Sequence, residues 1–122
     1  MEIEYVRSRF IKHFDGKTGN IYHSPGRINL IGEHTDYNGG FVFPGAVEQG
    51  IMAEVRPNGQ QTCNVYSIDL KDMVHFKIDD PKGPSATWAR YIYGVVQEMR
   101  ALGVDVKPFS AACAGDVPLG AG

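Results

Sequence analysis

The chain has 122 residues, 43% hydrophobic and 21% charged, which is an ordinary globular composition and the size of one domain. Its formal net charge of -2 excludes the strongly basic surface that binds nucleic acid or an anionic membrane. Cys63 and Cys113 lack metal-ligand spacing and predict reduced interior thiols, and His13, His23 and His75 are equally isolated. With no membrane-length apolar run and no signal-peptide pattern at the start, we expect a cytoplasmic protein with no membrane or nucleic-acid partner.

The first predicted elements are a helix and a pair of strands. Residues 2–14 predict the helix, and Gly16 ends it. The apolar side chains at helical spacing in this segment are Ile3, Val6, Phe10 and Phe14. Residues 20–32 then predict a strand, a turn and a second strand, with Pro25 and Gly26 as the break.

Short strands follow over the middle of the chain. Residues 41–59 predict two of them, the second ending at a turn of Pro57, Asn58 and Gly59. Residues 62–70 alternate, so that one face holds Cys63, Val65 and Ser67 and the other holds Asn64, Tyr66 and Ile68. Residues 72–80 alternate too, with one face made of Val74, Phe76 and Ile78.

Residues 87–103 predict a second, strongly amphipathic helix. Its expected apolar stripe consists of Trp88, Ile92, Val95, Val96, Met99 and Leu102. Ser85 or Thr87 can cap its start and Gly103 its end. The small residues of 108–118 predict a last strand, so the chain as a whole predicts an α+β fold.

Two stretches carry the chemistry. PGRINLIGEHTDYNGG, at 25–40, gathers Arg27, Glu33, His34 and Asp36 between glycines, directly after an apolar run. Taken alone, it is either a solvated turn after a strand or a site that holds a polar ligand. The final PLGAG follows a strand, where glycines let amide N–H groups converge on an anion, although a flexible tail has the same composition.

Together these stretches resemble the GHMP family of small-molecule kinases, and within it the galactokinases. The galactokinase run G-R-x-N-L-I-G-E-H-T-D-Y is matched from Gly26 to Tyr37, and PLGAG is similar to the opening of the family's phosphate-binding loop. The resemblance covers roughly residues 20–122. It implies an α+β amino-terminal GHMP-kinase domain over 1–122, a mixed β-sheet covered by helices, truncated within the phosphate-binding loop at 118–122. The resemblance further implies that the family's C-terminal domain is not part of these 122 residues.

The resemblance also implies roles for individual residues. Arg27 is the implied catalytic residue, near the γ-phosphate and the sugar's C1 hydroxyl, where a guanidinium stabilises developing negative charge. The implied galactose-binding residues are Glu33, His34, Asp36, Gly39 and Gly40. Those implied on the nucleotide side are Trp88, Gly120 and Gly122. For Trp88 the helical periodicity favours a place in the core instead.

ATP and Mg2+ are the implied cofactors, and we expect the metal ligands beyond Gly122. The implied reaction of the full-length protein is phosphorylation of the C1 hydroxyl of galactose. We expect this 122-residue amino-terminal piece to be inactive alone, and to self-associate through exposed apolar surface. Two alternatives stay open: a catalytically dead sugar- and ATP-binding regulator, and a related GHMP kinase acting on another sugar.

Overall fold

A computed structural model of the chain describes residues 2–31 and 43–115, and it describes side chains at 2–25 and 50–115. The elements in chain order are α1 (Ile3–His13), β1 (Asn20–Ile31), β2 (Phe43–Pro57), β3 (Cys63–Ser67), β4 (Asp72–Phe76), α2 (Thr87–Ala101) and β5 (Phe109–Gly115). Both helices fall where the sequence predicts them, and the expected α+β class is confirmed.

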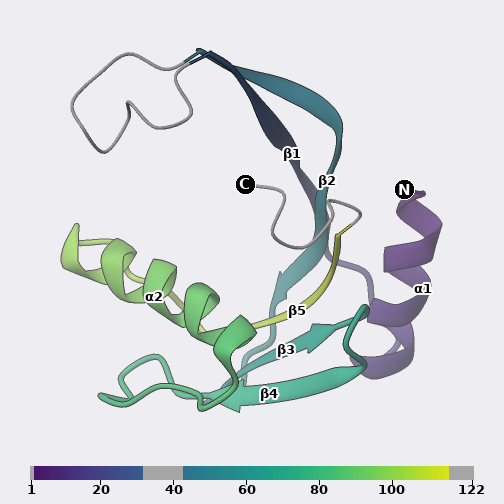
Figure 1. Ribbon diagram of the computed structural model, residues 1–122. Coiled ribbons are helices and arrows are strands. Elements are labelled where there is room, and N and C mark those ends of the chain that lie inside the picture. Colours follow the sequence, from purple (N-terminus) through teal and green to yellow (C-terminus); the bar gives the residue numbers. More distant parts are fainter. Residues whose placement is uncertain (1, 32–42, 116–122) are drawn as a thin grey trace.

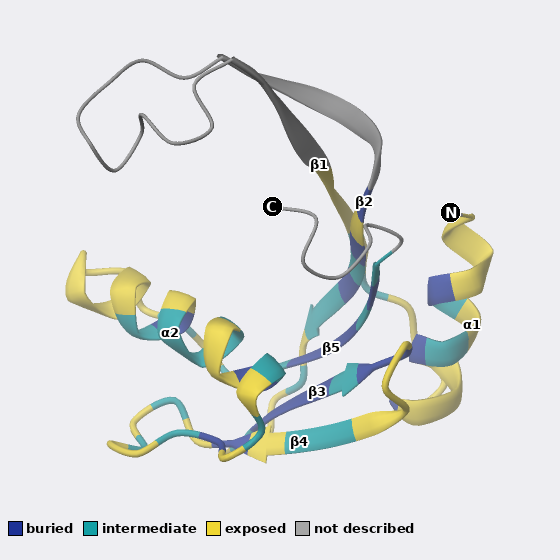
Figure 2. Ribbon diagram, viewed as in Figure 1, coloured by how far each residue is buried: buried dark blue, intermediate teal, exposed yellow. Residues whose placement is uncertain are grey.

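The strands form one mixed sheet in the order β1-β2-β5-β3-β4 (Figure 1). β1 with β2, β2 with β5, and β3 with β4 pair antiparallel, whereas β3 and β5 are parallel. The connection between the two parallel strands passes through β4 and α2. β1 and β4 therefore form the two edges, and the most buried strands, β3 and β5, lie inside the sheet (Figure 2).

The two helices cover opposite faces of this sheet (Figure 1). Alternate residues of β5 separate the faces, because Ala112 and Ala114 pack with α1 whereas Ala111 packs on the α2 side. The buried cluster under α1 consists of Val6, Phe10, Phe14, Met52, Ile68, Ala112 and Ala114. The cluster under α2 consists of Cys63, Val65, Phe76 and Ala111, with Trp88, Ile92 and Tyr93 packed against it. The alternation predicted for 62–70 and 72–80 is thereby confirmed.

A buried ion pair ties α1 to the sheet. Glu54 of β2 is 0% exposed, and its Oε1 accepts a hydrogen bond from Arg7 Nε of α1 at 2.8 Å. The other carboxylate oxygen accepts from the backbone N–H of Gly19 at 2.7 Å. One carboxylate thus joins the helix, the loop that leads into β1, and the second strand.

The predicted break at Pro25 and Gly26 is wrong, because β1 runs without interruption from Asn20 to Ile31. A register shift between Pro25 and Arg27 takes the place of a turn. Proline is tolerated there because β1 is an edge strand, where a missing N–H costs no hydrogen bond on the open side. Residues 43–57 likewise form one strand, not the expected two.

α2 buries a narrower face than the sequence predicts. Trp88, Ile92 and Val96 pack toward the sheet, as expected. Val95, Met99 and Leu102 are 60%, 40% and 83% exposed, so that part of the prediction is wrong. The fully buried Ala89 accounts for the difference, because its small side chain lets the helix approach the sheet along the line of Ala89, Tyr93 and Val96.

The ends of α2 differ from each other. Its N-cap residue is Ala86, with no side-chain hydrogen bond, so the predicted capping by Ser85 or Thr87 is wrong. The C-terminal prediction is confirmed. Gly103 has φ of +89°, its N–H donates to the Arg100 carbonyl, and the N–H of Val104 donates to the Met99 carbonyl. This pair of bonds is a Schellman motif, which requires a left-handed residue at the position of Gly103.

Candidate functional site

The candidate site is built where β1 and β5 flank β2. Ser24 of β1 pairs with Ile51 of β2, and Gly115 of β5 pairs with the same Ile51 from the other side. Since β1 and β5 are both antiparallel to β2, they run in the same direction and leave the sheet at the same end (Figure 1). Neighbouring strands lie about 4.8 Å apart, so Ser24 and Gly115 are separated by about 10 Å.

This geometry places the strands that lead into the two chemically distinctive stretches on either side of β2. Residues 25–40 begin on β1 beside Ser24, and residues 118–122 follow shortly after Gly115. They are separated by more than 75 residues in sequence (118 − 40 = 78). The pairing of β2 with both β1 and β5 makes the strands that lead into them run side by side with β2.

Arg27 lies on β1, opposite Ala46 of β2, in the part of the hairpin that extends past the end of β5. There, residues 26–31 and 43–49 form a two-stranded arm in which, among the described strands, β2 pairs with β1 alone. The remaining predicted residues of the signature and loop lie outside the described residues: Glu33, His34, Asp36, Gly39, Gly40, Gly120 and Gly122.

Gly50 allows β1 and β2 to come into unusually close contact at the base of this arm. A Cβ atom on Gly50 would lie 2.3 Å from the carbonyl oxygen of Ser24 and 2.8 Å from the Cα of Pro25. Both atoms belong to backbone, so no side-chain rotation could relieve the clash. Gly50 pairs with Pro25, so this close approach lies where the register shift between Pro25 and Arg27 begins. Arg27, the residue predicted to act on phosphate, follows the shift on β1.

The end of β5 is held from the other side by a carboxylate. Asp69, in the turn after β3, accepts a hydrogen bond from the backbone N–H of Gly115 at 2.8 Å. Burial, reinforced by the negative charge of Asp69, raises the pKa of Cys113 to about 11. β5, which leads into the glycine-rich segment, thus ends at a hydrogen bond to the negatively charged carboxylate of Asp69.

Burial keeps both thiols protonated near neutral pH, which disfavours nucleophilic chemistry because that chemistry needs the thiolate. Burial also raises the pKa of Cys63, although a hydrogen bond with the backbone of Phe109 partly opposes this effect. Both cysteines are free. Cys63 is fully buried, as expected of an interior thiol, whereas Cys113 is only partly buried.

Trp88 occupies a different part of the molecule from Arg27. Its ring packs against the cluster under α2, and its Nε1 donates to Asp72 Oδ2 at 2.9 Å. Asp72 begins β4, the edge strand opposite β1. The structure therefore brings Trp88 to the core, as its periodicity favours, and ties its polar atom to the far edge of the sheet. A role at the nucleotide stays a prediction.

In residues 2–31 and 43–115, no three side chains of His, Cys, Asp or Glu are grouped so that they could hold a metal ion. His75, one of the isolated histidines, shares a 2.7 Å hydrogen bond between its Nδ1 and Asn64 Oδ1. Neither α1 nor α2 combines the length and the apolar character that a membrane-crossing helix needs.

Comparison with known proteins decides the family. The family model described as the galactokinase galactose-binding signature matches residues 8–57, which include the second half of α1, all of β1 and β2, and the stretch 25–40. The chain belongs to the galactokinase family. A galactokinase of Roseiflexus sp. (strain RS-1) is 41% identical over 117 residues, covering 96% of this chain and 30% of the relative. One of Clostridium perfringens (strain SM101 / Type A) is 36% identical over 126 residues, covering 100% and 33%.

Solved structures also match the fold of this galactokinase-family chain. The crystal structure of Lactococcus lactis galactokinase complexed with galactose superimposes with a TM-score of 0.85 at 31% identity, covering 96% of this chain and 31% of that one. Methanococcus jannaschii mevalonate kinase matches in fold, with a TM-score of 0.68 at 16% identity. The chain thus spans about a third of the length of the galactokinases it matches.

Sequence reasoning missed Gly50 and Asp69, which position the two strands of the galactokinase-family site. For Gly50 a signal existed, because a lone glycine inside a strand pattern indicates a bulge or a close backbone approach. For Asp69 there was none. An aspartate after a strand is ordinary turn chemistry, and its contact with Gly115 spans 46 positions of sequence.

Proposed function

We propose that the full-length protein is a galactokinase, which transfers the γ-phosphoryl group of ATP to the C1 hydroxyl of galactose. The observation that carries the proposal is that the two strands leading into the signature stretch and the glycine-rich segment leave the sheet at the same end. β1 enters the signature stretch and β5 enters the glycine-rich segment, with only β2 between them. A sugar site and a phosphate site must adjoin for direct transfer, since the reacting atoms have to lie about 3–3.5 Å apart.

The family match supports galactose as the acceptor. The signature matched over residues 8–57 is a galactose-binding one, and the Lactococcus lactis relative was solved with galactose. In our proposal Glu33, His34 and Asp36 bind the sugar hydroxyls. A carboxylate accepts from two hydroxyls at once, and a neutral imidazole can donate and accept. An epimer would leave one such buried group unpaired, at a cost of about 1–3 kcal/mol.

Around these residues, glycines provide close approach. Gly39 and Gly40 let the backbone come near the sugar, and Gly120 and Gly122 direct amide N–H groups toward the nucleotide phosphates. Bound ATP with Mg2+ would supply the phosphoryl group and neutralise its charge, through metal ligands that we place beyond Gly122.

Arg27 carries the chemistry that this chain itself contributes. Phosphoryl transfer needs positioning and charge stabilisation more than covalent chemistry. A guanidinium is always charged and presents a fixed fork of N–H donors, so from β1 it would stabilise the negative charge that builds up on the transferring group. Its contribution would be larger in the transition state than in the bound substrate.

The test is to replace Arg27 in the full-length protein and to measure steady-state kinetics with ATP, Mg2+ and galactose. For Arg27→Ala, we expect kcat to fall by about 10²–10³, the typical cost of losing one preorganised donor. Arg27→Lys should recover only part of the loss, because an ammonium cannot reproduce the fork. The KM for galactose should change little, since the interaction is made mainly in the transition state.

Lys17→Ala, which removes an exposed cation near the start of β1, is the matched control and should leave kcat unchanged. Turnover of Arg27→Ala near that of the unaltered protein would refute the role of Arg27. Galactose binding without any turnover by the unaltered protein would instead indicate a sugar-binding regulator. Turnover of another sugar in preference to galactose would indicate a different GHMP kinase.

A further inference from the structure

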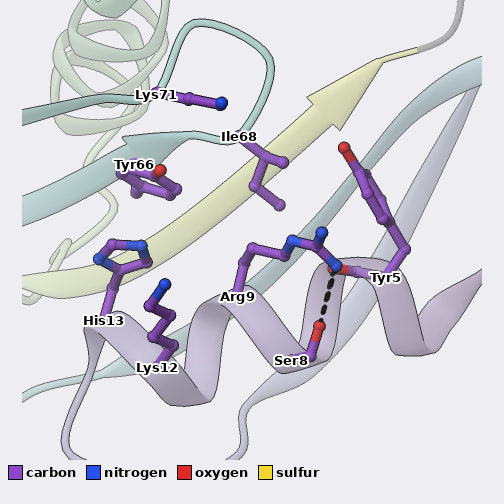
Figure 3. A pocket seen from close by; sticks show the side chains of 8 residues that line it. All are labelled: Tyr5, Ser8, Arg9, Lys12, His13, Tyr66, Ile68 and Lys71. Carbon is purple, nitrogen blue, oxygen red and sulfur yellow. Dashed lines mark hydrogen bonds between the residues drawn. The ribbon is translucent and has the colours of Figure 1, made fainter.

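A cavity, separate from the stretches discussed above, opens between α1 and the turn that joins β3 to β4 (Figure 3). Its volume is about 450 Å3. The residues that line it are Tyr5, Ser8, Arg9, Lys12, His13, Tyr66, Ile68 and Lys71. Figure 3 shows the side chains of α1 rising toward Tyr66 and Ile68, with Lys71 above them.

The lining is rich in cations and contains no carboxylate. Arg9, Lys12 and Lys71 contribute positive charge, and His13 adds a titratable imidazole. The ion pairs between described side chains, Arg7 with Glu54 and Lys107 with Asp105, include none of these groups. The cavity therefore carries a positive potential that no lining residue compensates.

The carboxylates nearest to Lys71 in sequence are engaged elsewhere. Asp69 accepts the N–H of Gly115 at 2.8 Å, and Asp72 accepts the indole N–H of Trp88 at 2.9 Å. Lys71 itself has φ of +51°, a left-handed conformation that is uncommon for a residue with a side chain. The turn thus directs its two acids to other donors while it keeps the lysine at the rim of the cavity.

Several of the lining groups are held in place before any ligand arrives. The Arg9 guanidinium lies over the Tyr5 ring at 4.2 Å, and its Nη1 donates to the Tyr5 carbonyl and to Ser8 Oγ, both at 3.2 Å. The other N–H groups of Arg9 make no hydrogen bond with a described residue. Across the cavity, the rings of His13 and Tyr66 are stacked with centroids 3.9 Å apart. Buried Ile68 adds an apolar wall.

We propose that this cavity is a binding site for a small phosphate-bearing molecule. An arginine fork, two ammonium groups and nearby hydroxyls are the donors that phosphate oxygens prefer. The aromatic and apolar walls suit a sugar or another small ring attached to the phosphate. The site requires neither residues 25–40 nor residues 118–122, so it stands independently of the galactokinase proposal.

Lysine acetylation of the full-length protein, read residue by residue by mass spectrometry, tests this site. The probes are glucose 6-phosphate, inorganic phosphate and glucose, all at one ionic strength set with sodium chloride. We expect glucose 6-phosphate to slow acetylation of Lys12 and Lys71 about fivefold at about 5 mM, for a Kd of about 1 mM. The exposed Lys17 and Lys77, on other segments, are internal controls and should react unchanged.

The phosphate source is read from the other probes. Equal protection by inorganic phosphate assigns the site to the free anion, and weaker protection by it assigns the site to a phosphate ester. Protection by glucose alone, equal protection of all lysines, or no protection would overturn the proposal. Lys71→Gln should abolish most of the protection at Lys12, whereas Lys17→Gln should leave it intact. Full protection of Lys12 in Lys71→Gln would also contradict a shared site.

Discussion

The two faces of the sheet hold their helices by different means. Under α1, an apolar cluster is joined by a buried charge, because Glu54 binds both Arg7 and the N–H of Gly19. Under α2, the contacts are apolar packing together with hydrogen bonds to the segment after β4, such as Gln97 Nε2 donating to the Ile78 carbonyl at 2.7 Å.

This difference shows how one sheet can combine a face that is sensitive to single substitutions with a face that tolerates them. An ion pair is directional, and losing one partner leaves the other charge or its polar neighbours unsatisfied. Apolar packing has no such direction, so its cost follows the area that is uncovered. We therefore expect α1 to respond steeply to a single polar substitution, and α2 to respond in small steps.

The largest expected effect comes from Glu54→Ala. It removes two hydrogen bonds to a fully buried carboxylate, so we expect the α1 side to lose about 3 kcal/mol, or roughly a hundredfold in hydrogen-exchange protection. Glu54→Gln keeps the shape and should lose less. The measurement is amide exchange of α1 in the full-length protein. Glu98→Ala, an exposed carboxylate on α2, is the control, and equal losses in the two variants would erase the contrast between the faces.

The next prediction concerns the rate at which Cys113, on the α2 side of the sheet, reacts with a thiol reagent. Because the pKa of Cys113 is raised to about 11, its thiolate fraction at pH 8 should be about a hundredfold lower than that of an unperturbed cysteine. Iodoacetamide labelling of Cys113, followed by mass spectrometry, should therefore be slow at pH 8 and rise about tenfold per pH unit toward pH 11. Asp69→Asn should speed it by removing the negative charge. A labelling rate that levels off below pH 9 would contradict the raised pKa.

The smallest effects come from two glycines of α2, and they should have opposite signs. Gly94→Ala meets open space inside the helix and should stabilise α2 by about 0.5–1 kcal/mol. Gly103→Ala should destabilise it by about 1 kcal/mol, because φ of +89° strains any residue with a Cβ. Amide exchange of α2 in the full-length protein measures both. Shifts of the same sign would mean that tertiary packing, and not backbone conformation, controls this helix.

Local patterns in the sequence predicted most of the fold. The alternation around Val65 and Val74 gives both faces of β3 and β4, and Gly103 marks the end of α2. The error at Pro25 has a long-range cause. Whether a proline interrupts a strand depends on whether a neighbour needs its N–H, and that depends on strand order, which only long-range pairing decides.

The candidate site was only partly predictable for a similar reason. The signature from Gly26 to Tyr37 is visible in the sequence, but the placement of the strand that leads into it, relative to the end of β5, depends on Ile51 pairing with Ser24 and Gly115 at once. The cationic cavity was hidden in the same way. Helical spacing places Tyr5, Arg9 and His13 on one side of α1, yet nothing local brings the turn with Lys71 over that side.

Small changes of angle at the base of the two-stranded arm of β1 and β2, which extends past β5, produce large displacements at its far end. Six residues of strand span about 20 Å, so a rotation of about 5° at the base would move the far end by about 2 Å, and misplacement by about 1 Å can slow a reaction a hundredfold. Rigidity at the base of the arm therefore matters more than rigidity along its length. The base lies at Gly50, where the backbones of β1 and β2 are so close that a single methyl group would force them apart.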